Sequence, residues 1–308
     1  MFSIAAPGDF DLPRAVCSYG YFMLAPNRWD AAKAILHTVV TDIDGQPIAV
    51  QVRTRSGRLS WETNPAIAQR SETAAMIRRA VIRMLRLDED FAAFHALHPA
   101  AKRARFGRLF RSATLFEDVV KTMTGCNTTW SSTMRMNALL CTKVGRGGFP
   151  TPGQIAALRP SQLQRACKVG YRAERIVRLA RDVAEGRLDL AWFEEPGRGT
   201  DELLEALRSI FGIGPYAAAN ICHLLGRYDR MAIDSETYRH FREKHGLAMP
   251  KTQTGLRRLH KKIERHYDRY APYQFLAYWL ELWGTYESRF GDSTAWDTRE
   301  GGPAVTGR

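Results

Sequence analysis

The stretch SIFGIGPYAAANI, residues 209–221, is a glycine-punctuated turn between two segments that look helical. The segment before it, TDELLEALRSIF (200–211), offers Thr200 as an N-cap and carries leucines at helical spacing. After the turn, Pro215 suits the first position of a second helix, and Gly226 can end that helix. The sequence therefore predicts two helices joined by a tight hairpin.

This hairpin, over residues 201–226, can either close two packed helices or hold a ligand. Gly212 and Gly214 flank Ile213, and glycine permits positive φ and a close approach of another backbone. The first N–H groups of the second helix have no partner within that helix and suit a phosphate oxygen. The Gly-x-Gly spacing alone is weak evidence, because it also suits an ordinary turn between helices.

The charge of the chain favours an anionic partner. Its 308 residues include 45 Lys and Arg against 32 Asp and Glu, a formal net charge of +13. Such an excess attracts polyanions, of which nucleic acid is the commonest, although some basic proteins are merely soluble. The five cysteines are scattered without a Cys-x-x-Cys pair, which argues against a disulfide framework and a cysteine-held metal site.

Neither end of the chain suggests a membrane or secreted protein. The N-terminal segment MFSIAAPGDFDLPRA (1–15) lacks the pattern of a signal peptide, and no apolar run reaches the roughly 18 residues of a membrane span. We expect a cytoplasmic protein, at the nucleoid if the source is bacterial.

The pattern of apolar and polar residues changes along the chain. Residues 1–70 look β-rich, because PIAVQVRTRSGRLSWET (47–63) alternates apolar and polar residues around a Ser-Gly turn. Residues 71–290 carry helical patterns broken by glycine- and proline-rich turns. Residues 291–308 have little to bury and predict a flexible tail. The expected fold is mainly α with a small β-rich N-terminal domain.

Two neighbouring stretches give the hairpin a context. LRSIFGIGPYAAANI (207–221), followed by YDRMAIDSETYRHF (228–241), resembles the helix-hairpin-helix (HhH-GPD) superfamily of DNA glycosylases, in particular its 8-oxoguanine and 3-methyladenine branches. The resemblance spans about residues 71–290. It implies two helical subdomains flanking a DNA-binding cleft, and the β-rich N-terminus resembles the extra domain of those two branches.

The resemblance also implies roles for the hairpin. Gly212, Ile213 and Gly214 would grip DNA phosphates through their backbone amides. A monovalent cation, K⁺ or Na⁺, would sit on backbone carbonyls near Arg208, Ile210 and Ile213. No side-chain metal site and no required cofactor are expected.

Asp234 matches the family's catalytic aspartate, a short loop beyond the second hairpin helix. Breaking a glycosidic bond develops oxocarbenium character on the sugar, which a nearby carboxylate can stabilise, or it can deprotonate a water. The alternative is that Asp234 only caps the helix SETYRHF (235–241). Both roles are compatible, because a capped terminus is one way to fix a catalytic carboxylate.

Tyr216 occupies the position at which bifunctional members of the superfamily carry a lysine that attacks the sugar. A tyrosine cannot form an imine. The resemblance therefore points to a monofunctional glycosylase without abasic-site lyase activity, with Tyr216 on the DNA-binding surface. A lysine from elsewhere, or an inactive scaffold, remains an alternative.

Two further stretches resemble the family's segments that separate stacked bases. LFEDVVKTMTGCNTTWSST (115–133) places Asn127 where an asparagine enters the space of the flipped nucleotide, and VGYRAERIVRLA (169–180) places Tyr171 as a wedge with Arg172 close to the DNA. An ordinary loop asparagine and a buried tyrosine are the rival interpretations. Ser131 and Ser132 stand where the 8-oxoguanine branch has an arginine that reads the orphaned cytosine.

The aromatic stretch YAPYQFLAYWLELWGTYESRFG (270–291) predicts the base pocket, although such a helix is often only core. Gln274 and Tyr278 share a helix face and correspond to the glutamine and aromatic residue that hold the base in 8-oxoguanine glycosylases. Trp279 and Trp283 are the alternative lining, and would suit a cationic alkylated base.

The favoured function is a monofunctional glycosylase of base-excision DNA repair that removes a damaged or modified purine base from duplex DNA and acts as a monomer. The alternatives are a catalytically silent protein that binds distorted DNA, and an enzyme of other chemistry on the same scaffold. The segment RRLHKKIERHYDRY (257–270) is either a phosphate-binding surface or a solvated helix face.

Overall fold

The N-terminal part of the chain forms one antiparallel sheet. The computed structural model describes residues 2–42, 44–68, 70–296 and 298. The strands are β1 (Phe2–Ala5), β2 (Arg28–Asp30), β3 (Ile35–Thr41), β4 (Pro47–Arg55) and β5 (Arg58–Glu62), in the order β1-β5-β4-β3-β2. The predicted hairpin joins β4 to β5 through Ser56 and Gly57, both at positive φ. The expected β-rich N-terminus on a mainly helical chain is confirmed.

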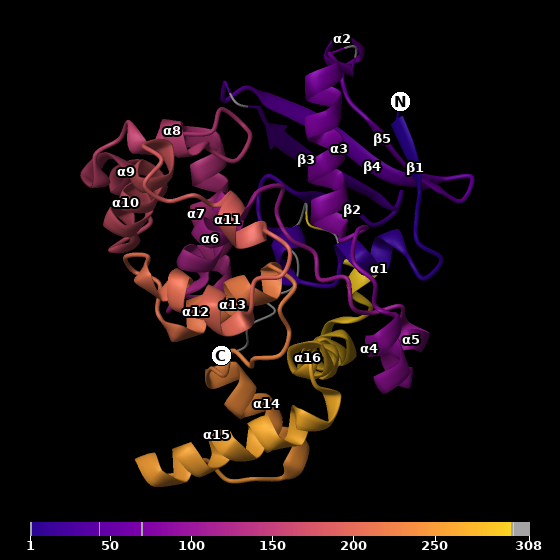
Figure 1. The fold of residues 1–308 in the computed structure, drawn as a ribbon, viewed down its shortest axis with the longest axis vertical. Coiled ribbons are helices and arrows are strands. Elements are labelled where there is room, and N and C mark those ends of the chain that lie inside the picture. The colour runs from indigo at the N-terminus through magenta and orange to yellow at the C-terminus, as the bar shows by residue number, and fades with distance from the viewer. Residues whose placement is uncertain (1, 43, 69, 297, 299–308) are drawn as a thin grey trace.

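Helices make up most of the remaining chain and fall into three groups along the sequence (Figure 1). The first group accompanies the sheet: α1 (Leu12–Val16), α2 (Pro65–Ala68), α3 (Ser71–Leu85), α4 (Ala92–Leu97) and α5 (Pro99–Ala104). The second group is α6 (Leu115–Gly125), α7 (Trp130–Lys143), α8 (Pro152–Ala156), α9 (Pro160–Cys167), α10 (Arg172–Ala184), α11 (Ala191–Glu194), α12 (Thr200–Ser209) and α13 (Pro215–Leu224). The third is α14 (Ser235–His245), α15 (Gln253–Tyr267) and α16 (Gln274–Phe290). Short 3₁₀ turns lie at Gly20–Met23, Asp268–Tyr270 and Ser293–Ala295.

Two hydrophobic cores divide the molecule, and neither is confined to the N-terminal 70 residues. One core joins the sheet with α3 and the last helices, so that Trp61, Ile77 and Trp283 belong to the same cluster. The other core is built by α6–α13 alone, with Val119 and Ile221 among its fully buried members. The sheet therefore has no separate core, and two helical halves face each other.

The hairpin forms between α12 and α13 as the sequence predicts. Gly212 has φ +89°, Pro215 occupies the first turn of α13, and Gly226, at φ +84°, follows its end. The predicted N-cap is wrong by one residue. Gly199 caps α12, because the Thr200 hydroxyl turns away and donates a 2.6 Å hydrogen bond to Asp229.

The first residues of the predicted tail contact the rest of the protein. Trp296 is buried against Trp283 in the first core, with ring centroids 5.5 Å apart, and its indole N–H donates to the Gly291 carbonyl. The backbone N–H of Trp29 donates a 2.9 Å hydrogen bond to the hydroxyl of Thr298. Residue 297 and residues 299–308 lie outside the described residues.

Candidate active site

A cavity of about 880 Å³ lies where the two cores meet. Several stretches far apart in sequence line it: residues 19–23, the end of α6 with the loop after it, the hairpin with the start of α13, residues 232–236, and α16, and Arg175 of α10 also borders it. This size suits a small organic group such as a nucleobase. The cavity brings together Asp234, Tyr216, Tyr278, Trp279 and Asn127, which the sequence assigned to one site.

Asp234 is the N-cap of α14 and also lines the cavity. Its Oδ1 accepts a 2.9 Å hydrogen bond from the backbone N–H of Thr237 and lies 3.0 Å from the Thr237 hydroxyl. That hydroxyl is in turn 3.0 Å from the hydroxyl of Tyr278 on α16. The capping interpretation is confirmed, and the cap fixes one oxygen while the carboxylate remains in the cavity wall.

Asp234 is the unneutralised carboxylate of this wall. Glu236 also lines the cavity, but its oxygens accept hydrogen bonds from Arg239, at 2.9 Å from Nε, and from the hydroxyl of Tyr286, at 2.8 Å. These bonds lower the pKa of Glu236 despite its partial burial. Within the described residues, no Lys, Arg or His forms an ion pair with Asp234. The carboxylate of Asp234 can therefore stabilise a positive charge that develops in the cavity.

Tyr216 lies in the first turn of α13 and shares the cavity wall with Asp234. Tyr216 leaves 40% of its surface exposed, but partial desolvation of its phenol, followed by the negative charge of Asp234 and a hydrogen bond to that carboxylate, raises the pKa of Tyr216. The hydroxyl therefore stays protonated at neutral pH and acts as a donor. It offers neither an amine nor a phenolate at this position.

Aromatic rings form most of the remaining wall. Phe275 and Trp279 of α16 stack with centroids 5.7 Å apart, and Tyr19 packs on Trp279 at 4.9 Å. Opposite them, the Trp130 ring lies so close to Gly20 that a Cβ there would meet it at 2.9 Å. The segment 19–23 was not among the site residues predicted from the sequence, although the aromatic residues of YGYF (19–22) were an available signal.

Gln274 and Tyr278 both lie on α16 as expected, but they have different surroundings. Tyr278 lines the cavity and is buried, which raises the pKa of its phenol. Gln274 is not among the residues that line the cavity, and its Oε1 is buried without a hydrogen-bond partner among the described residues. Trp283, the alternative lining residue, does border the cavity.

Asn127 is exposed in the loop just after α6 and borders the cavity at a φ of +51°. Arg172, expected close to DNA, is instead buried behind this loop. Its guanidinium donates to the carbonyls of Met123, at 3.0 Å, and of Cys126. It also donates to the Asn127 carbonyl at 3.3 Å. Arg172 therefore positions the Asn127 loop from inside the protein.

Tyr171 caps α10 and leaves 53% of its surface exposed. It is not buried, so the rival interpretation of a core tyrosine does not apply. The guanidinium of Arg175 lies 4.9 Å from the centre of its ring, and Arg175 itself lines the cavity. The sequence analysis missed Arg175, although its position one turn after Tyr171 was a usable signal.

The hairpin leaves backbone donors uncovered. Within the described residues, the N–H groups of Gly214, Tyr216 and Ala217 make no hydrogen bond, and no side chain caps α13. On the other side of the turn, the carbonyls of Arg208 and Ile213 accept no hydrogen bond from any described residue. The Ile213 N–H, expected to bind a phosphate, instead donates a 3.0 Å hydrogen bond to the Ile210 carbonyl, which was expected to help hold the cation. Free N–H groups at a helix start suit an anion, and free carbonyl oxygens suit a cation such as K⁺ or Na⁺.

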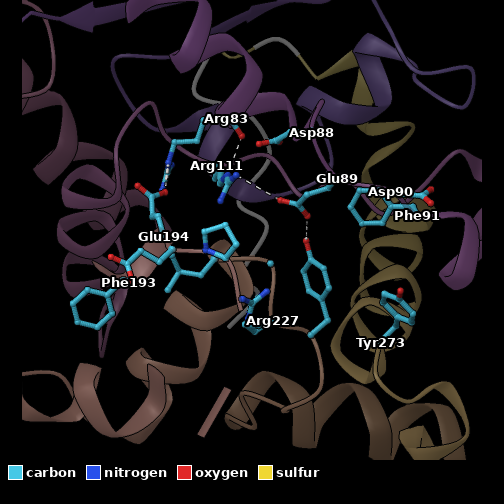
Figure 2. A pocket seen from close by; sticks show the side chains of 15 residues that line it. Arg83, Asp88, Glu89, Asp90, Phe91, Arg111, Phe193, Glu194, Arg227 and Tyr273 are labelled. Carbon is cyan, nitrogen blue, oxygen red and sulfur yellow. Dashed lines mark hydrogen bonds and ion pairs between the residues drawn. The ribbon is translucent and has the colours of Figure 1, made fainter. Parts of the chain in front are cut away.

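A second cavity, of about 430 Å³, is lined by charged groups that already pair with one another (Figure 2). Arg83 pairs with Glu194 at 2.7 Å, and Arg111 lies 3.5 Å from Glu89. Arg111 also donates to the carbonyl of Arg83 on α3, at 2.9 Å, and to the carbonyl of Leu224 at the end of α13. This cluster therefore anchors the second hairpin helix to α3 and is separate from the aromatic cavity.

Three solved structures with this arrangement are DNA glycosylases. The 3-methyladenine DNA glycosylase of Archaeoglobus fulgidus is similar over 92% of this chain and 99% of its own, with a TM-score of 0.68 and 20% identity. MBOgg1, in complex with a low-affinity DNA ligand, is similar over 92% of this chain and 100% of its own, with a TM-score of 0.64 and 18% identity. The 8-oxoguanine glycosylase/lyase of Clostridium acetobutylicum, in complex with DNA, gives a TM-score of 0.56 at 12% identity over 87% of this chain and 93% of its own.

These likenesses confirm the predicted helix-hairpin-helix glycosylase fold. No protein-family model matches the sequence, and no curated protein matches it significantly. None of the helices in the described part of the chain is long and apolar enough to cross a membrane.

Proposed function

We propose that this protein is a monofunctional DNA glycosylase that removes a modified purine base from duplex DNA in base-excision repair. The observation that carries the proposal is the carboxylate of Asp234, which has no cationic partner among the described residues and lies in an aromatic cavity beside the hairpin. Loss of the base leaves positive charge on the sugar, which Asp234 stabilises, and the carboxylate takes the proton of the water that attacks the sugar.

The lining of the cavity favours a cationic alkylated purine over 8-oxoguanine. A planar cation is attracted to the faces of electron-rich rings, and Tyr19, Trp279 and Trp283 supply such rings. Gln274, the residue expected to hydrogen-bond the edge of 8-oxoguanine, is absent from the lining.

Two observations support the absence of lyase chemistry. Tyr216 presents a protonated phenol where a lysine would be required. Lys121 also borders the cavity, but its side chain is fully buried and its Nζ lies 2.6 Å from the Glu117 carboxylate. An amine held in a buried ion pair is not free to attack a sugar.

The hairpin is the proposed grip on the DNA backbone. The free N–H groups of Gly214 and Tyr216 bind a phosphate oxygen, and a K⁺ or Na⁺ ion at the carbonyls of Arg208 and Ile213 adds positive charge behind them. Asn127 fills the space that the flipped nucleotide leaves. The protein acts on its substrate as a monomer.

The test uses labelled duplexes that each carry one lesion: 8-oxoguanine, an alkylated adenine, hypoxanthine or uracil. Each is incubated with wild type, Asp234→Asn and Asp11→Asn, and half of every sample is treated with alkali. Asparagine preserves an N-cap, and Asp11 caps α1 outside the cavity, so its variant is a matched control.

We expect strand breaks only after alkali, on the alkylated adenine duplex, about a hundredfold slower or more in Asp234→Asn and unchanged in Asp11→Asn. Breaks without alkali would refute the monofunctional assignment. Tight binding without base release from any duplex would favour the silent DNA-binding protein, the second candidate that the capping role of Asp234 permits. Release of a different base would change the proposed substrate but not the proposed reaction.

A further inference from the structure

Two arginines beside the hairpin have no charged partner among the residues that the structure describes. Arg175 and Arg178 lie one helical turn apart on α10, so their side chains share a face. Neither makes an ion pair or a hydrogen bond with any residue that the structure describes. Most other arginines of this region are engaged, such as Arg172 with backbone carbonyls and Arg198 with Glu202.

Each of the two guanidiniums is held by an exposed ring. Arg175 lies 4.9 Å from the centre of Tyr171, and Arg178 lies 4.7 Å from the centre of Phe211. Phe211 leaves 42% of its surface exposed and belongs to the hairpin turn itself. Arginine stacked on an aromatic face keeps its N–H edge available while the flexible stem is restrained.

The hairpin also fixes the stem of Arg175. Gly212 presents no side chain, and a Cβ there would lie 2.6 Å from the Cγ of Arg175. The arginine therefore crosses the turn at close contact and reaches the rim of the aromatic cavity. The side chains of Tyr171, Arg175, Arg178 and Phe211 form one arginine–aromatic strip that runs from the cavity rim along the hairpin.

We propose that Arg175 and Arg178 bind neighbouring phosphates of the duplex next to the flipped nucleotide, with Tyr171 and Phe211 ordering both guanidiniums before DNA arrives. The inference rests on the proposed function. It assigns the contact to Arg175 because Arg172, the position expected from the sequence, is buried and occupied by the carbonyls of Met123 and Asn127. Weakly hydrated guanidiniums without ion pairs among the described residues, beside uncovered backbone N–H groups, fit an anionic partner, and under the proposed function the anions are DNA phosphates.

The test is the salt dependence of DNA binding, measured by fluorescence anisotropy with the full chain. The probes are a duplex with a tetrahydrofuran abasic-site analogue and the same duplex undamaged. The variants are Arg175→Met, Arg178→Met and the double variant, because methionine keeps an unbranched stem. Arg103→Met is the control, since Arg103 is an exposed cation on α5, on the opposite side of the molecule from α10 (Figure 1).

The slope of log K against log salt concentration is negative, and each lost phosphate contact decreases its magnitude by about 0.9. We expect this decrease in each single variant, about twice as much in the double variant, and no change in Arg103→Met. Both duplexes should lose affinity by a similar factor, because phosphate contacts carry no base information. Phe211→Leu should weaken binding while leaving the slope unchanged, since the number of contacts stays the same.

Unchanged slopes in the arginine variants would overturn the inference, as would an equal decrease in Arg103→Met. A loss confined to the abasic duplex at constant slope would also overturn it, because Arg175 would then contact bases. These outcomes are separate from failure of the proposed function, which would appear as wild-type binding without release of any base. A wild-type protein that did not bind either duplex would refute both.

Discussion

Substitution of the two hairpin glycines by alanine should have different effects: Gly212→Ala should lower folding stability, whereas Gly214→Ala should weaken DNA binding. Gly212 has φ +89°, and its Cβ position is crowded by Arg175, whereas Gly214 has φ −91° and no atom within 4 Å of its Cβ position. An L-residue in the left-handed region costs about 1–2 kcal/mol, and displacing the arginine adds to that cost. Alanine also restricts the conformations of the unfolded chain more than glycine does, which stabilises the folded state by about 0.4–1 kcal/mol. Gly212→Ala should therefore lose about 1–2 kcal/mol of folding free energy.

Gly214→Ala should leave stability within about 0.5 kcal/mol of wild type. The same gain from the unfolded chain applies, and it is offset by alanine being a poorer N-cap than glycine for α13. The variant should nevertheless bind an abasic-analogue duplex about tenfold more weakly, because a methyl group would stand where a phosphate approaches the free N–H groups.

Thermal unfolding and anisotropy titrations of both variants provide the assay. At about 2–4 °C per kcal/mol, Gly212→Ala should melt roughly 2–8 °C below wild type. A wild-type melting temperature for Gly212→Ala would refute the strained geometry of the turn. Wild-type affinity of Gly214→Ala would refute the close approach of DNA to this backbone.

Three further outcomes follow from the same structure. Tyr216→Lys should produce strand breaks without alkali and a borohydride-trapped DNA adduct, because it places an amine beside Asp234; absence of the adduct would show that the position does not reach the sugar. Arg172→Met should lower the free energy of unfolding by about 3 kcal/mol in urea titrations, because buried carbonyls lose a charged donor. It should also slow base release, because the Asn127 loop loses its anchor. A loss below about 1 kcal/mol would contradict this account. Burial lowers the pKa of His223 in the folded chain to about 3, whereas a histidine in the unfolded chain has its usual pKa of about 6.5. Between pH 6.5 and 3 only the unfolded chain binds this proton. The free energy of unfolding should therefore fall over this range by up to about 1.4 kcal/mol per pH unit. His223→Gln should flatten that dependence in urea titrations at several pH values, and an unchanged slope would exclude this histidine as its source.

The β-hairpin of β4 and β5 and the helical hairpin followed from local signals in the sequence. Alternation along β4 and β5 and the turn at Ser56 and Gly57 fix a β-hairpin, because side chains of a strand point alternately to its two faces. In the same way, Gly212 and Pro215 fix the turn of the helical hairpin through backbone sterics that depend on neighbouring residues alone. The capping role of Asp234 belongs to this class, since its partner Thr237 is three residues away.

Only the tertiary structure decided which of these residues form a site. The aromatic wall combines residues 19–23 with α16, which meet because both bury apolar surface in the first core. Arg172 and Arg175 have similar sequence surroundings, yet one is enclosed by the carbonyls of α6 and its loop, and the other remains without a charged partner among the described residues. Their difference depends on how α10 packs against α6. Sequence spacing fixes the face of a helix, whereas the packing of distant segments determines what that face meets.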